Sequence, residues 1–363
     1  MKTVRTVIIG CGNFCRCTLP GVGRHEGFEI VAVVDPSERN RREIGALAGL
    51  GPDRRFAATS AAFDAVEADF AFVFSNVGAH AENVRAALEA GCCVSVAKPF
   101  VDALSEGTEL VELARARGLW ISVGQTTRLI PNTQAMKDLI QRGDLGAPAF
   151  GNMHIYRNRM EHLSPYSIHE RWPVINATAI HNFDLLRYLF EADIVRVCFR
   201  GIKAAWNPYD DPGAVTGWLE MDTGLVISYF HSFVSKVYLG ADHPCQHAMI
   251  QGGKGALFWG GPWGHGAVTF HRAEAQTVET LPMSDRDFEA QTWDYCQWLY
   301  ESLTQGREVF AEASDNLWSL AAIKASELSA QQGGTAVEVG AFGRLAGLPQ
   351  REKEQRERKL CSY

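Results

Sequence analysis

A β-branched run that ends in a glycine turn is the feature that most constrains the fold of this chain. Val7-Ile8-Ile9 is followed by the loop Gly10-Cys11-Gly12-Asn13-Phe14-Cys15, and a helical stretch comes next. Further strand-like apolar runs lie at residues 28–35, 70–74, 93–97 and 120–123, with helical stretches between them, for example 79–90 and 105–117. Because these strands are apolar on both sides, the alternation predicts a parallel sheet covered by helices on both faces.

The glycine loop has the chemistry of a dinucleotide-binding turn. Gly10 permits a tight turn, and Gly12 lets the backbone approach a pyrophosphate, which the free N–H groups and dipole of the next helix attract. Cys15 stands where the usual fingerprint has its third glycine. Asp35 ends the second strand, 23 residues after Gly12, and can accept hydrogen bonds from ribose hydroxyls. An ordinary strand-turn-helix with an Asp-Pro turn is the alternative to this prediction of dinucleotide binding.

The charge at the end of the second strand predicts NAD as the cofactor. The Asp35 carboxylate can accept from a ribose 2′-hydroxyl and repels a 2′-phosphate. Arg39, Arg41 and Arg42 follow it, and one of these guanidinium groups could reach a phosphate, so NADP stays open.

Length and composition limit the class of protein. A chain of 363 residues predicts two domains, and 46% hydrophobic with 21% charged residues is typical of a soluble globular protein. The net charge of -7 argues against a nucleic-acid partner. The sequence shows no apolar run of 18 residues and no signal peptide, which predicts no membrane association and a cytoplasmic location.

The cysteines predict neither a disulfide framework nor a metal site. Nine is an odd number in a long chain. Cys11, Cys15 and Cys17 cluster, but a metal ligand inside the glycine loop would conflict with the loop's other task. Residues 243–247, His-Pro-Cys-Gln-His, lack a second ligand pair at a zinc-like spacing.

Several ordered segments resemble the Gfo/Idh/MocA family, the glucose-fructose oxidoreductase and inositol dehydrogenase group. Residues 75–80, Ser-Asn-Val-Gly-Ala-His, resemble its Thr-Pro-Asn-x-x-His segment, and Ala97-Lys98-Pro99 resembles its Glu-Lys-Pro motif. Residues 124–128 and 142–146 resemble the link into its second domain, and residues 180–189 resemble its active-site helix. The family order of these segments, from about residue 5 to about residue 340, makes the resemblance specific.

The resemblance implies a Rossmann domain over 1–124, a substrate-binding and oligomerisation α/β domain over 125–345, and a charged tail over 346–363. The second domain would have an open, mainly antiparallel sheet, and the sequence fits strands at 194–205, 214–221, 225–234 and 247–251. Asp222-Thr223-Gly224 predicts a hairpin turn, and residues 285–304 and 313–331 predict helices. Because the family's sheets pack face to face, we expect a homodimer or homotetramer.

Lys98 and His181 are the candidates for proton transfer. Lys98 follows the fifth parallel strand, where open α/β sheets bind ligands, and a lowered pKa would let it take a hydroxyl proton. His181 begins the helix that the resemblance places at the nicotinamide, and histidine titrates near neutrality. A solvated lysine and a satisfied core histidine are the alternatives, and Asp184 fits the surface of the same helix.

The resemblance also implies the remaining site residues. The expected cofactor contacts are Gly10, Gly12, Asn13, Phe14, Asp35, Ser75, Asn76, His80, Lys98 and Gln125. The expected substrate contacts are Lys98, Arg128, Tyr156, Asn176 and His181. Polar and aromatic residues gather between 154 and 181, where they could bind a polyol or an acidic sugar or form a solvated loop.

The chain departs from the family pattern at three positions. Ala177 stands where the family has an aspartate four residues before its histidine, Ala97 replaces the glutamate of Glu-Lys-Pro, and Ala179 replaces a glycine. Two carboxylates that would orient the proton-transfer pair are therefore missing. Either the pair suffices, or Glu170 or Asn176 takes part, or the reaction differs.

The leading interpretation is an NAD(P)-dependent oxidoreductase. It would transfer a hydride between the nicotinamide and a hydroxyl or keto carbon of a sugar, cyclitol or related polyhydroxy compound. A catalytically weak dinucleotide-binding sensor and a non-redox enzyme that recycles bound NAD are the alternatives. Net turnover would indicate the first, a bound but inert cofactor the second, and product without net reduction the third.

Overall fold

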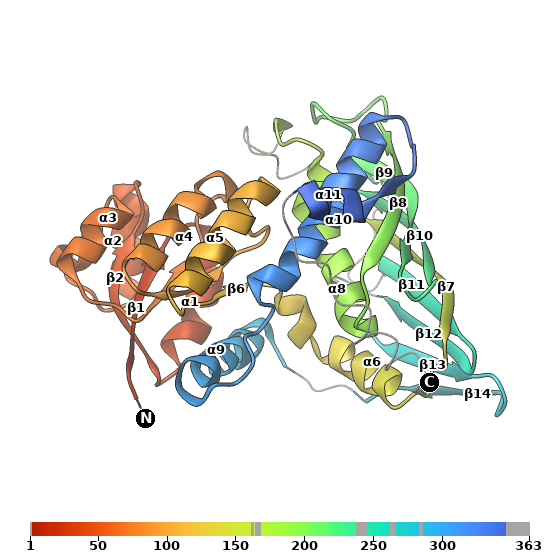
Figure 1. Ribbon diagram of the computed structural model, residues 1–363, viewed down its shortest axis with the longest axis horizontal. Coiled ribbons are helices and arrows are strands. Elements are labelled where there is room, and N and C mark those ends of the chain that lie inside the picture. The colour runs from red at the N-terminus through yellow and green to blue at the C-terminus, as the bar shows by residue number, and fades with distance from the viewer. Residues whose placement is uncertain are drawn as a thin grey trace. The chain divides into compact units, whose positions relative to one another are not determined.

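The computed structural model describes residues 2–160, 163, 168–236, 246–260, 266–282 and 286–345. The chain forms two compact units, the first made of residues 1–129 and 286–317 and the second of 130–285 and 318–363 (Figure 1). The predicted boundaries at residues 124 and 345 stay predictions, and they did not anticipate that 286–317 packs with the first unit. The predicted tail, 346–363, lies outside the described residues.

The first unit is built on a six-stranded parallel sheet. Its strands lie in the order β3-β2-β1-β4-β5-β6. Their bounds are β1 (Val4–Ile9), β2 (Phe28–Val34), β3 (Arg55–Phe56), β4 (Phe70–Val73), β5 (Cys93–Val96) and β6 (Ile121–Val123). The order reverses between β1 and β4, the switch point at which such sheets bind ligands. The predicted Rossmann fold is confirmed.

Helices alternate with these strands along the chain and connect them. They are α1 (Asn13–Gly23), α2 (Glu38–Leu47), α3 (Thr59–Ala65), α4 (His80–Glu89) and α5 (Leu104–Ala116), with the short 3₁₀ helices η1 (Pro52–Arg54), η2 (Val77–Ala79) and η3 (Thr126–Leu129). Most crossovers return the chain to a neighbouring parallel strand, whereas the connection from β3 to β4 passes to the other side of β1.

A helix from late in the chain, α9 (Phe288–Gln305), completes the core of the first unit. Its Tyr295 and Leu299 pack in one cluster with Val22 of α1 and with Phe70 and Phe72 of β4. This helix was predicted from its apolar periodicity, but the unit that it joins was not.

The second unit has a nine-stranded sheet in the order β14-β13-β12-β11-β7-β10-β9-β8-β15. Its strands are β7 (Pro148–Tyr156), β8 (Ile194–Ile202), β9 (Ala214–Met221), β10 (Val226–Ser232), β11 (Gln246–Gly252), β12 (Gly255–Gly260), β13 (Val268–Arg272), β14 (Thr277–Thr280) and β15 (Val337–Glu338). Only β10 and β7 pair in parallel, so the predicted mainly antiparallel sheet is confirmed. Strand β7, strands β12 to β14 and the short β15 were not predicted.

The predicted hairpin joins β9 to β10. Gly224 has a φ of +84°, and its N–H donates to the Met221 carbonyl at 2.9 Å. The predicted strand 214–221 and helix 313–331 agree with β9 and with α10 (Ala313–Gln331).

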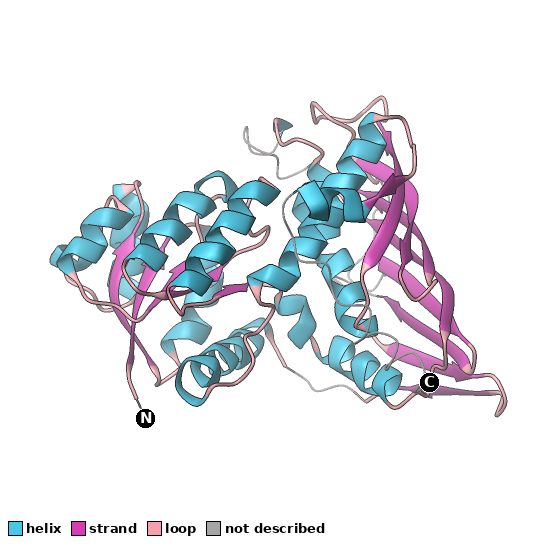
Figure 2. Ribbon diagram, in the orientation of Figure 1, coloured by secondary structure: helices cyan, strands magenta, loops and turns pink. Residues whose placement is uncertain are grey.

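Helices stand on one face of this sheet. They include α6 (Pro131–Gln141), α8 (Ile180–Phe190) and α11 (Val339–Leu345), and Figure 2 shows them on the same side of the magenta strands. No helix of the described residues is long and apolar enough to cross a membrane.

A buried polar cluster fixes α8 within the second unit. The sequence predicted Asp184 on the helix surface, and this is wrong, because the residue is fully buried. Its carboxylate accepts from the Ser319 hydroxyl at 3.3 Å. Arg187 donates to Ser319 at 2.9 Å and forms an ion pair with Asp193, 2.7 Å from Nη2 to Oδ1. The cluster therefore ties α8 both to α10 and to the residue before β8.

We expect Asp193→Ala to destabilise the fold by about 3–5 kcal/mol, because the Arg187 guanidinium would stay buried without its partner. The measurement is the free energy of unfolding in urea. Glu279→Ala, which breaks the half-exposed pair with Arg272, is the matched control and should cost about 1 kcal/mol or less. Equal losses in the two variants would contradict the assignment.

Candidate cofactor and active site

The glycine loop leaves room for an anion at the start of α1. Gly10 has a φ of +93°, and a Cβ there would lie 2.4 Å from the Ser75 nitrogen, so only glycine fits. A Cβ on Gly12 would meet no atom within 4 Å, and no side chain caps the helix that follows. The first turn of α1 therefore keeps its N–H groups for a ligand, as a pyrophosphate requires.

Asp35 ties the loop to the end of β2. Its carboxylate accepts from Cys11 N at 2.7 Å and from Ser37 N at 2.8 Å, and the residue is 8% exposed. Oδ1 also accepts from Asn40 Nδ2 at 3.4 Å, so Oδ2 keeps a lone pair that can accept from a ribose hydroxyl. Arg41 donates to the backbone carbonyls of Asp35 and Pro36, so its guanidinium is held on this loop.

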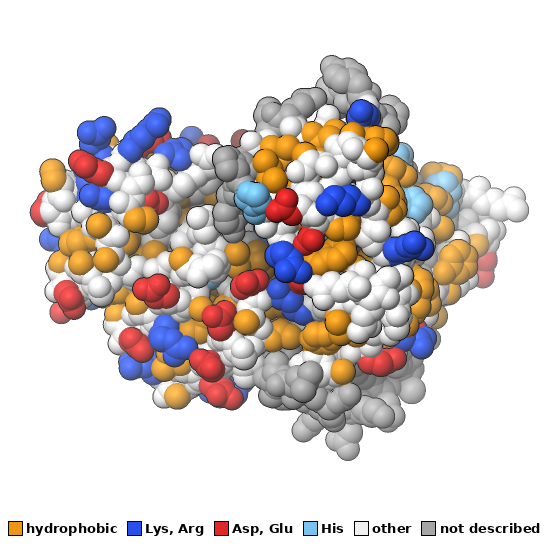
Figure 3. All heavy atoms as spheres, turned by 90° about the horizontal axis from the view of Figure 1, so that it is seen from above, with side chains coloured by type: hydrophobic (Ala, Val, Ile, Leu, Met, Phe, Trp, Pro, Cys, Tyr) orange, Lys and Arg blue, Asp and Glu red, His pale blue; other side chains and the backbone are white. Residues whose placement is uncertain are grey.

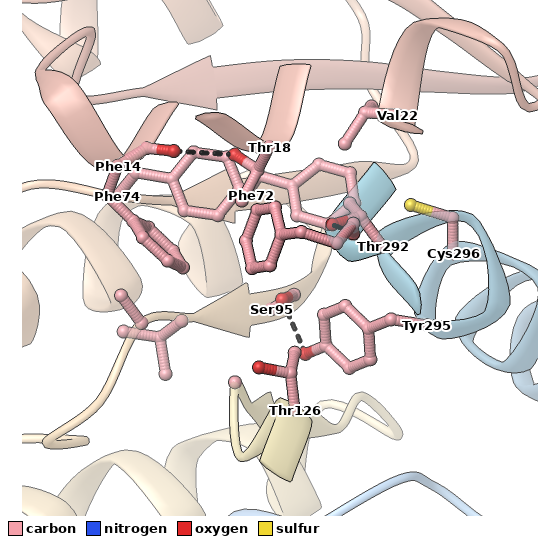
Figure 4. Close-up of a pocket in the computed structure, with 14 residues that line it drawn as sticks. Phe14, Thr18, Val22, Phe72, Phe74, Ser95, Thr126, Thr292, Tyr295 and Cys296 are labelled. Carbon is pink, nitrogen blue, oxygen red and sulfur yellow. Dashed lines mark hydrogen bonds between the residues drawn. The ribbon is translucent and has the colours of Figure 1, made fainter. Parts of the chain in front are cut away.

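An apolar pocket opens within the first unit between α1, the ends of β4 and β5, and α9. Phe14, Phe74, Ala97 and Thr292 are among the residues that line it. Figure 4 shows the rings of Phe14, Phe72 and Phe74 on one side and the α9 side chains on the other. The Phe14 and Phe74 ring centres lie 5.3 Å apart, edge to face. The pocket wall is mostly apolar, and it includes Ala97, the residue before Lys98.

Thr292 belongs to the wall of this pocket and was missed by the sequence analysis. Nothing in its local sequence marks it, because every pocket residue outside α9 comes from the part of the chain before residue 127. The same helix is fixed by the Tyr295 hydroxyl, which lies 2.8 Å from Ser95 Oγ and 3.1 Å from Ser122 Oγ. Burial raises the pKa of Tyr295 to about 12, so this phenol stays neutral.

The Gln125 side chain is an unsatisfied buried amide. It is fully buried just after β6, and neither its Nε2 nor its Oε1 has a hydrogen-bond partner in the described part of the chain. A buried amide of this kind fits a ligand that both donates and accepts, such as a carboxamide.

The loops after β4 and β5 are joined by His80. Its Nε2 lies 2.8 Å from the Ser75 carbonyl, and its Nδ1 lies 2.9 Å from the Pro99 carbonyl. Burial lowers the pKa of His80, and the ring is 1% exposed. Both ring nitrogens therefore face carbonyl oxygens of the protein, and a neutral ring donates to one of the two. Asn76, in the loop after β4, is exposed.

Two further predicted site residues of the first unit, Lys98 and Arg128, differ in burial. Lys98 is half-buried directly after β5, and its bond to Pro99 is cis. Arg128 is 8% exposed and forms an ion pair with Asp315 at 3.6 Å.

His181 lies in the first turn of α8, after an unpredicted π-helix at η5 (Ile175–Ala179). Hydrogen bonds in such a turn join residues five apart, so the turn is wider than in an α-helix. Asn176 as well as Ala177 then lies about one turn before His181. Asn176 Nδ2 donates to the Arg171 carbonyl at 2.7 Å, which leaves its Oδ1 as an acceptor.

Strand alternation separates Tyr156 from α8. Tyr156 packs on Phe230, with ring centres 5.2 Å apart, whereas Asn182 of α8 donates to the Tyr229 hydroxyl. Tyr229 and Phe230 are neighbours on β10 and point to opposite faces of the sheet. Tyr156 therefore lies on the face opposite to α8, so the structure does not bring it beside the Asn182 side chain. His162 and Tyr166, which belong to the polar and aromatic stretch of residues 154–181, lie outside the described residues.

The cysteines of the loop are packing residues in this unit. Cys11 and Cys15 are both fully buried, and a hydrogen bond with Cys15, together with burial, raises the pKa of the Cys11 thiol. In the described ranges no three His, Cys, Asp or Glu side chains gather as metal ligands do. Residues 243–245 of the histidine-cysteine stretch lie outside those ranges.

Known proteins are similar to this chain over most of its length. D-apiose dehydrogenase from Paraburkholderia graminis is 24% identical over 346 residues, which cover 92% of this chain and 90% of that protein. Inositol 2-dehydrogenase 3 from Saccharopolyspora erythraea is 31% identical over 195 residues, 53% of this chain and 55% of that protein. The fold is like that of an oxidoreductase from Agrobacterium radiobacter solved with NAD+, L-tartaric acid and magnesium. That comparison has a TM-score of 0.84 at 20% identity and covers 94% of this chain and 100% of that one.

Two family models match consecutive parts of the chain. Residues 4–125 match the oxidoreductase family with an NAD-binding Rossmann fold, and residues 133–258 match the GFO/IDH/MocA C-terminal domain. Together they span more than half of the sequence and agree with the glycine loop, Asp35 and the mixed sheet. The chain therefore belongs to the Gfo/Idh/MocA family of oxidoreductases and carries its NAD-binding Rossmann domain at the N-terminus.

Proposed function

We propose that this protein is an NAD-dependent dehydrogenase or reductase that acts on a CH–OH group of a sugar, cyclitol or related polyhydroxy compound. The observation that carries the proposal is the open, uncapped start of α1 above Gly12, with Asp35 fixed beside it. The relatives named for D-apiose and inositol act in the same class of chemistry. Under this proposal the protein works without nucleic acid or membrane, in the cytoplasm.

Lys98 and His181 are the proposed proton-transfer residues. Hydride exchange is the chemistry that NAD supplies when bound. The protein's own task is to hold the substrate hydroxyl and to take its proton, or to return it in the reverse direction. Lys98 suits this task because it is half-buried at a strand end, and His181 because its helix is anchored by the Asp184 and Arg187 cluster.

His80 is proposed as a positioning residue for Lys98, not as a direct cofactor ligand. Its two ring nitrogens face carbonyl oxygens of the β4 and β5 loops. The remaining cofactor contacts are proposed at the glycine loop, Asp35, Ser75, Asn76 and Gln125. The buried Gln125 amide fits the carboxamide of the nicotinamide.

The missing carboxylates favour a second candidate function. With Ala97 and Ala177 in place of glutamate and aspartate, a catalytically weak dinucleotide-binding sensor would have the same glycine loop and the same fold. The acceptor Oδ1 of Asn176 can replace the orienting part of the aspartate but not its charge. Turnover of the wild type over a panel of polyols and sugars separates the two functions.

We expect Lys98→Met and His181→Ala each to lower kcat by about 10²-fold or more, the usual effect of removing a general acid or base. The affinity for NADH should stay within about twofold, because neither change touches the pyrophosphate or ribose contacts. Steady-state kinetics and a fluorescence titration with NADH make the measurement. Lys254→Met removes an exposed lysine of the second unit and should leave both quantities unchanged. Near wild-type turnover of both site variants would reject the pair.

We expect NADH to bind about tenfold or more tightly than NADPH, because the Asp35 carboxylate accepts from a 2′-hydroxyl and repels a 2′-phosphate. Asp35→Ser should reduce this preference, and Asp53→Ser, at an exposed acid of η1, should not. The two dissociation constants are measured by titration for each variant. Tighter binding of NADPH by the wild type would overturn the expectation.

We expect a homodimer or homotetramer that packs through the outer face of the second sheet. Phe150, Val226 and Phe258 are exposed there by 55%, 39% and 40%, and Phe150 lies opposite Val226. Light scattering at micromolar concentration should give a multiple of 40.0 kDa. Phe150→Glu should lower that mass, whereas Leu47→Glu, at an exposed apolar residue of the first unit, should not. A monomeric wild type would reject this assembly.

A further inference from the structure

A chain of buried hydrogen bonds joins α8 to β10. Asn182 Nδ2 donates to the Tyr229 hydroxyl at 2.7 Å, and that hydroxyl lies 3.0 Å from His231 Nδ1. Tyr229 and His231 are fully buried, and Asn182 is 7% exposed. Because the amide nitrogen can only donate, the Tyr229 oxygen accepts from it, and His231 Nδ1 is the acceptor within reach of the Tyr229 proton.

The tautomer that follows leaves a buried donor on His231. A neutral imidazole whose Nδ1 accepts carries its proton on Nε2. This Nε2 has no hydrogen-bond partner among the described residues. Burial, with the charges of Arg157 and Arg159, holds the pKa of His231 well below its usual value, so the ring stays neutral. Buried donors are rarely unpaired in proteins, and this one points to an acceptor on a bound molecule.

Two guanidinium groups belong to the same corner of the second unit. The backbone N–H groups of Arg157 and Arg159 donate to the carbonyls of Ser232 and Phe233, so the chain after β7 runs along the end of β10. The Arg159 guanidinium carbon lies 4.4 Å from the centre of the Phe233 ring. Both positive charges act on His231, two residues before Phe233.

Among the described residues, no carboxylate is bonded to Arg159. Its guanidinium stacks on Phe233 and forms no ion pair or side-chain hydrogen bond with a described residue. Burial lowers its pKa, while Tyr209 and Glu170 act in the opposite sense through longer-range electrostatics. A cation in this setting gains from an anion that enters with a ligand.

The nearby aspartates are engaged elsewhere. Asp210 pairs with His169 at 2.7 Å, and Asp211 pairs with Arg171 at 3.0 Å. The overall charge of -7 repels anions, and Figure 3 shows Lys and Arg mixed with Asp and Glu over the face that it draws. An affinity for anions at Arg159 would therefore come from this local cluster and not from a general field.

We propose that Arg157, Arg159 and the Nε2–H of His231 bind an anionic group of the substrate, a carboxylate or a phosphate. The substrate is then an acidic or phosphorylated sugar and not a neutral polyol, an inference that rests on the proposed function. Guanidinium and imidazole N–H groups donate only, which matches a group whose oxygens only accept. The hydrogen-bond chain ends at Asn182, next to His181, so the anion would be held at a fixed place relative to the proposed proton-transfer residue.

The test compares anionic sugars with their neutral parents on the NADH-loaded, full-length protein. The probes are aldonic and uronic acids of four to six carbons, the corresponding sugar phosphates and the neutral sugars. We expect at least one acid or phosphate to bind about tenfold or more tightly than its parent, and the two arms separate carboxylate from phosphate. If no anionic probe in the panel binds better than its neutral parent, the inference is overturned.

Variants test whether the preference for anionic probes depends on Arg159. Arg159→Met should weaken binding of the preferred anion by about 10- to 100-fold and leave its neutral parent within about twofold. Arg159→Lys should keep part of the affinity, because it keeps the charge but loses the planar fork. Arg200→Met removes an exposed arginine of β8 and is the matched control. Equal losses for anionic and neutral probes would contradict the proposal, and the thermal midpoint of each variant identifies unfolding.

Binding and turnover report on different claims. Anion binding that depends on Arg159 without any turnover would support this site and count against the proposed dehydrogenase. Turnover of neutral sugars, with no anionic probe bound more tightly than its neutral parent, would support the dehydrogenase and reject the anion site.

Discussion

The structure of the first unit depends on the contact between α9 and the parallel sheet. Sheet residues such as Phe70 and Phe72 need apolar cover, and Tyr295 and Leu299 of α9 supply it beside α1. The Tyr295 hydroxyl adds bonds to Ser95 and Ser122, on two neighbouring strands. In the sequence, α9 follows residues 130–285, which belong to the second unit. The apolar pocket beside Phe14 is lined in part by α9, so its wall depends on segments far apart in the chain.

The site of the first unit is held by bonds between loops at the carboxyl ends of the strands. Asp35 joins the β2 end to the glycine loop through Cys11, and His80 joins the β4 loop to the β5 loop through Ser75 and Pro99. Each of these hydrogen bonds involves a backbone N–H or carbonyl group that could also bond to a cofactor or substrate. These buried hydrogen bonds fix the loops before a ligand binds, so ligand binding costs little further conformational entropy. A reactive group on such a loop is therefore held in place in advance.

The second unit holds polar groups where a sheet would ordinarily be apolar. Asp184 and Arg187 are buried but bonded within the protein, and they anchor α8. His231 and Arg159 differ, because a donor on each is left without a bonded acceptor in the described residues. Buried polar groups that are paired support the fold, whereas those without an acceptor indicate where a ligand binds.

The sequence alone determined the parallel sheet, the glycine loop with Asp35, the hairpin at Gly224 and the helix of residues 313–331. Each depends on residues close together in the chain, where apolar period and turn chemistry act locally. Local patterns did not reveal β7, the π-helix before His181 or the burial of Asp184, because packing against distant segments decides them. Only the tertiary structure brought Thr292 to the pocket beside Phe14, placed Tyr156 on the face opposite to α8, and set Arg159 on Phe233 beside His231. Such contacts join residues tens to hundreds of positions apart, and the physical reason that they form is burial of the whole sheet, which no short stretch of sequence encodes.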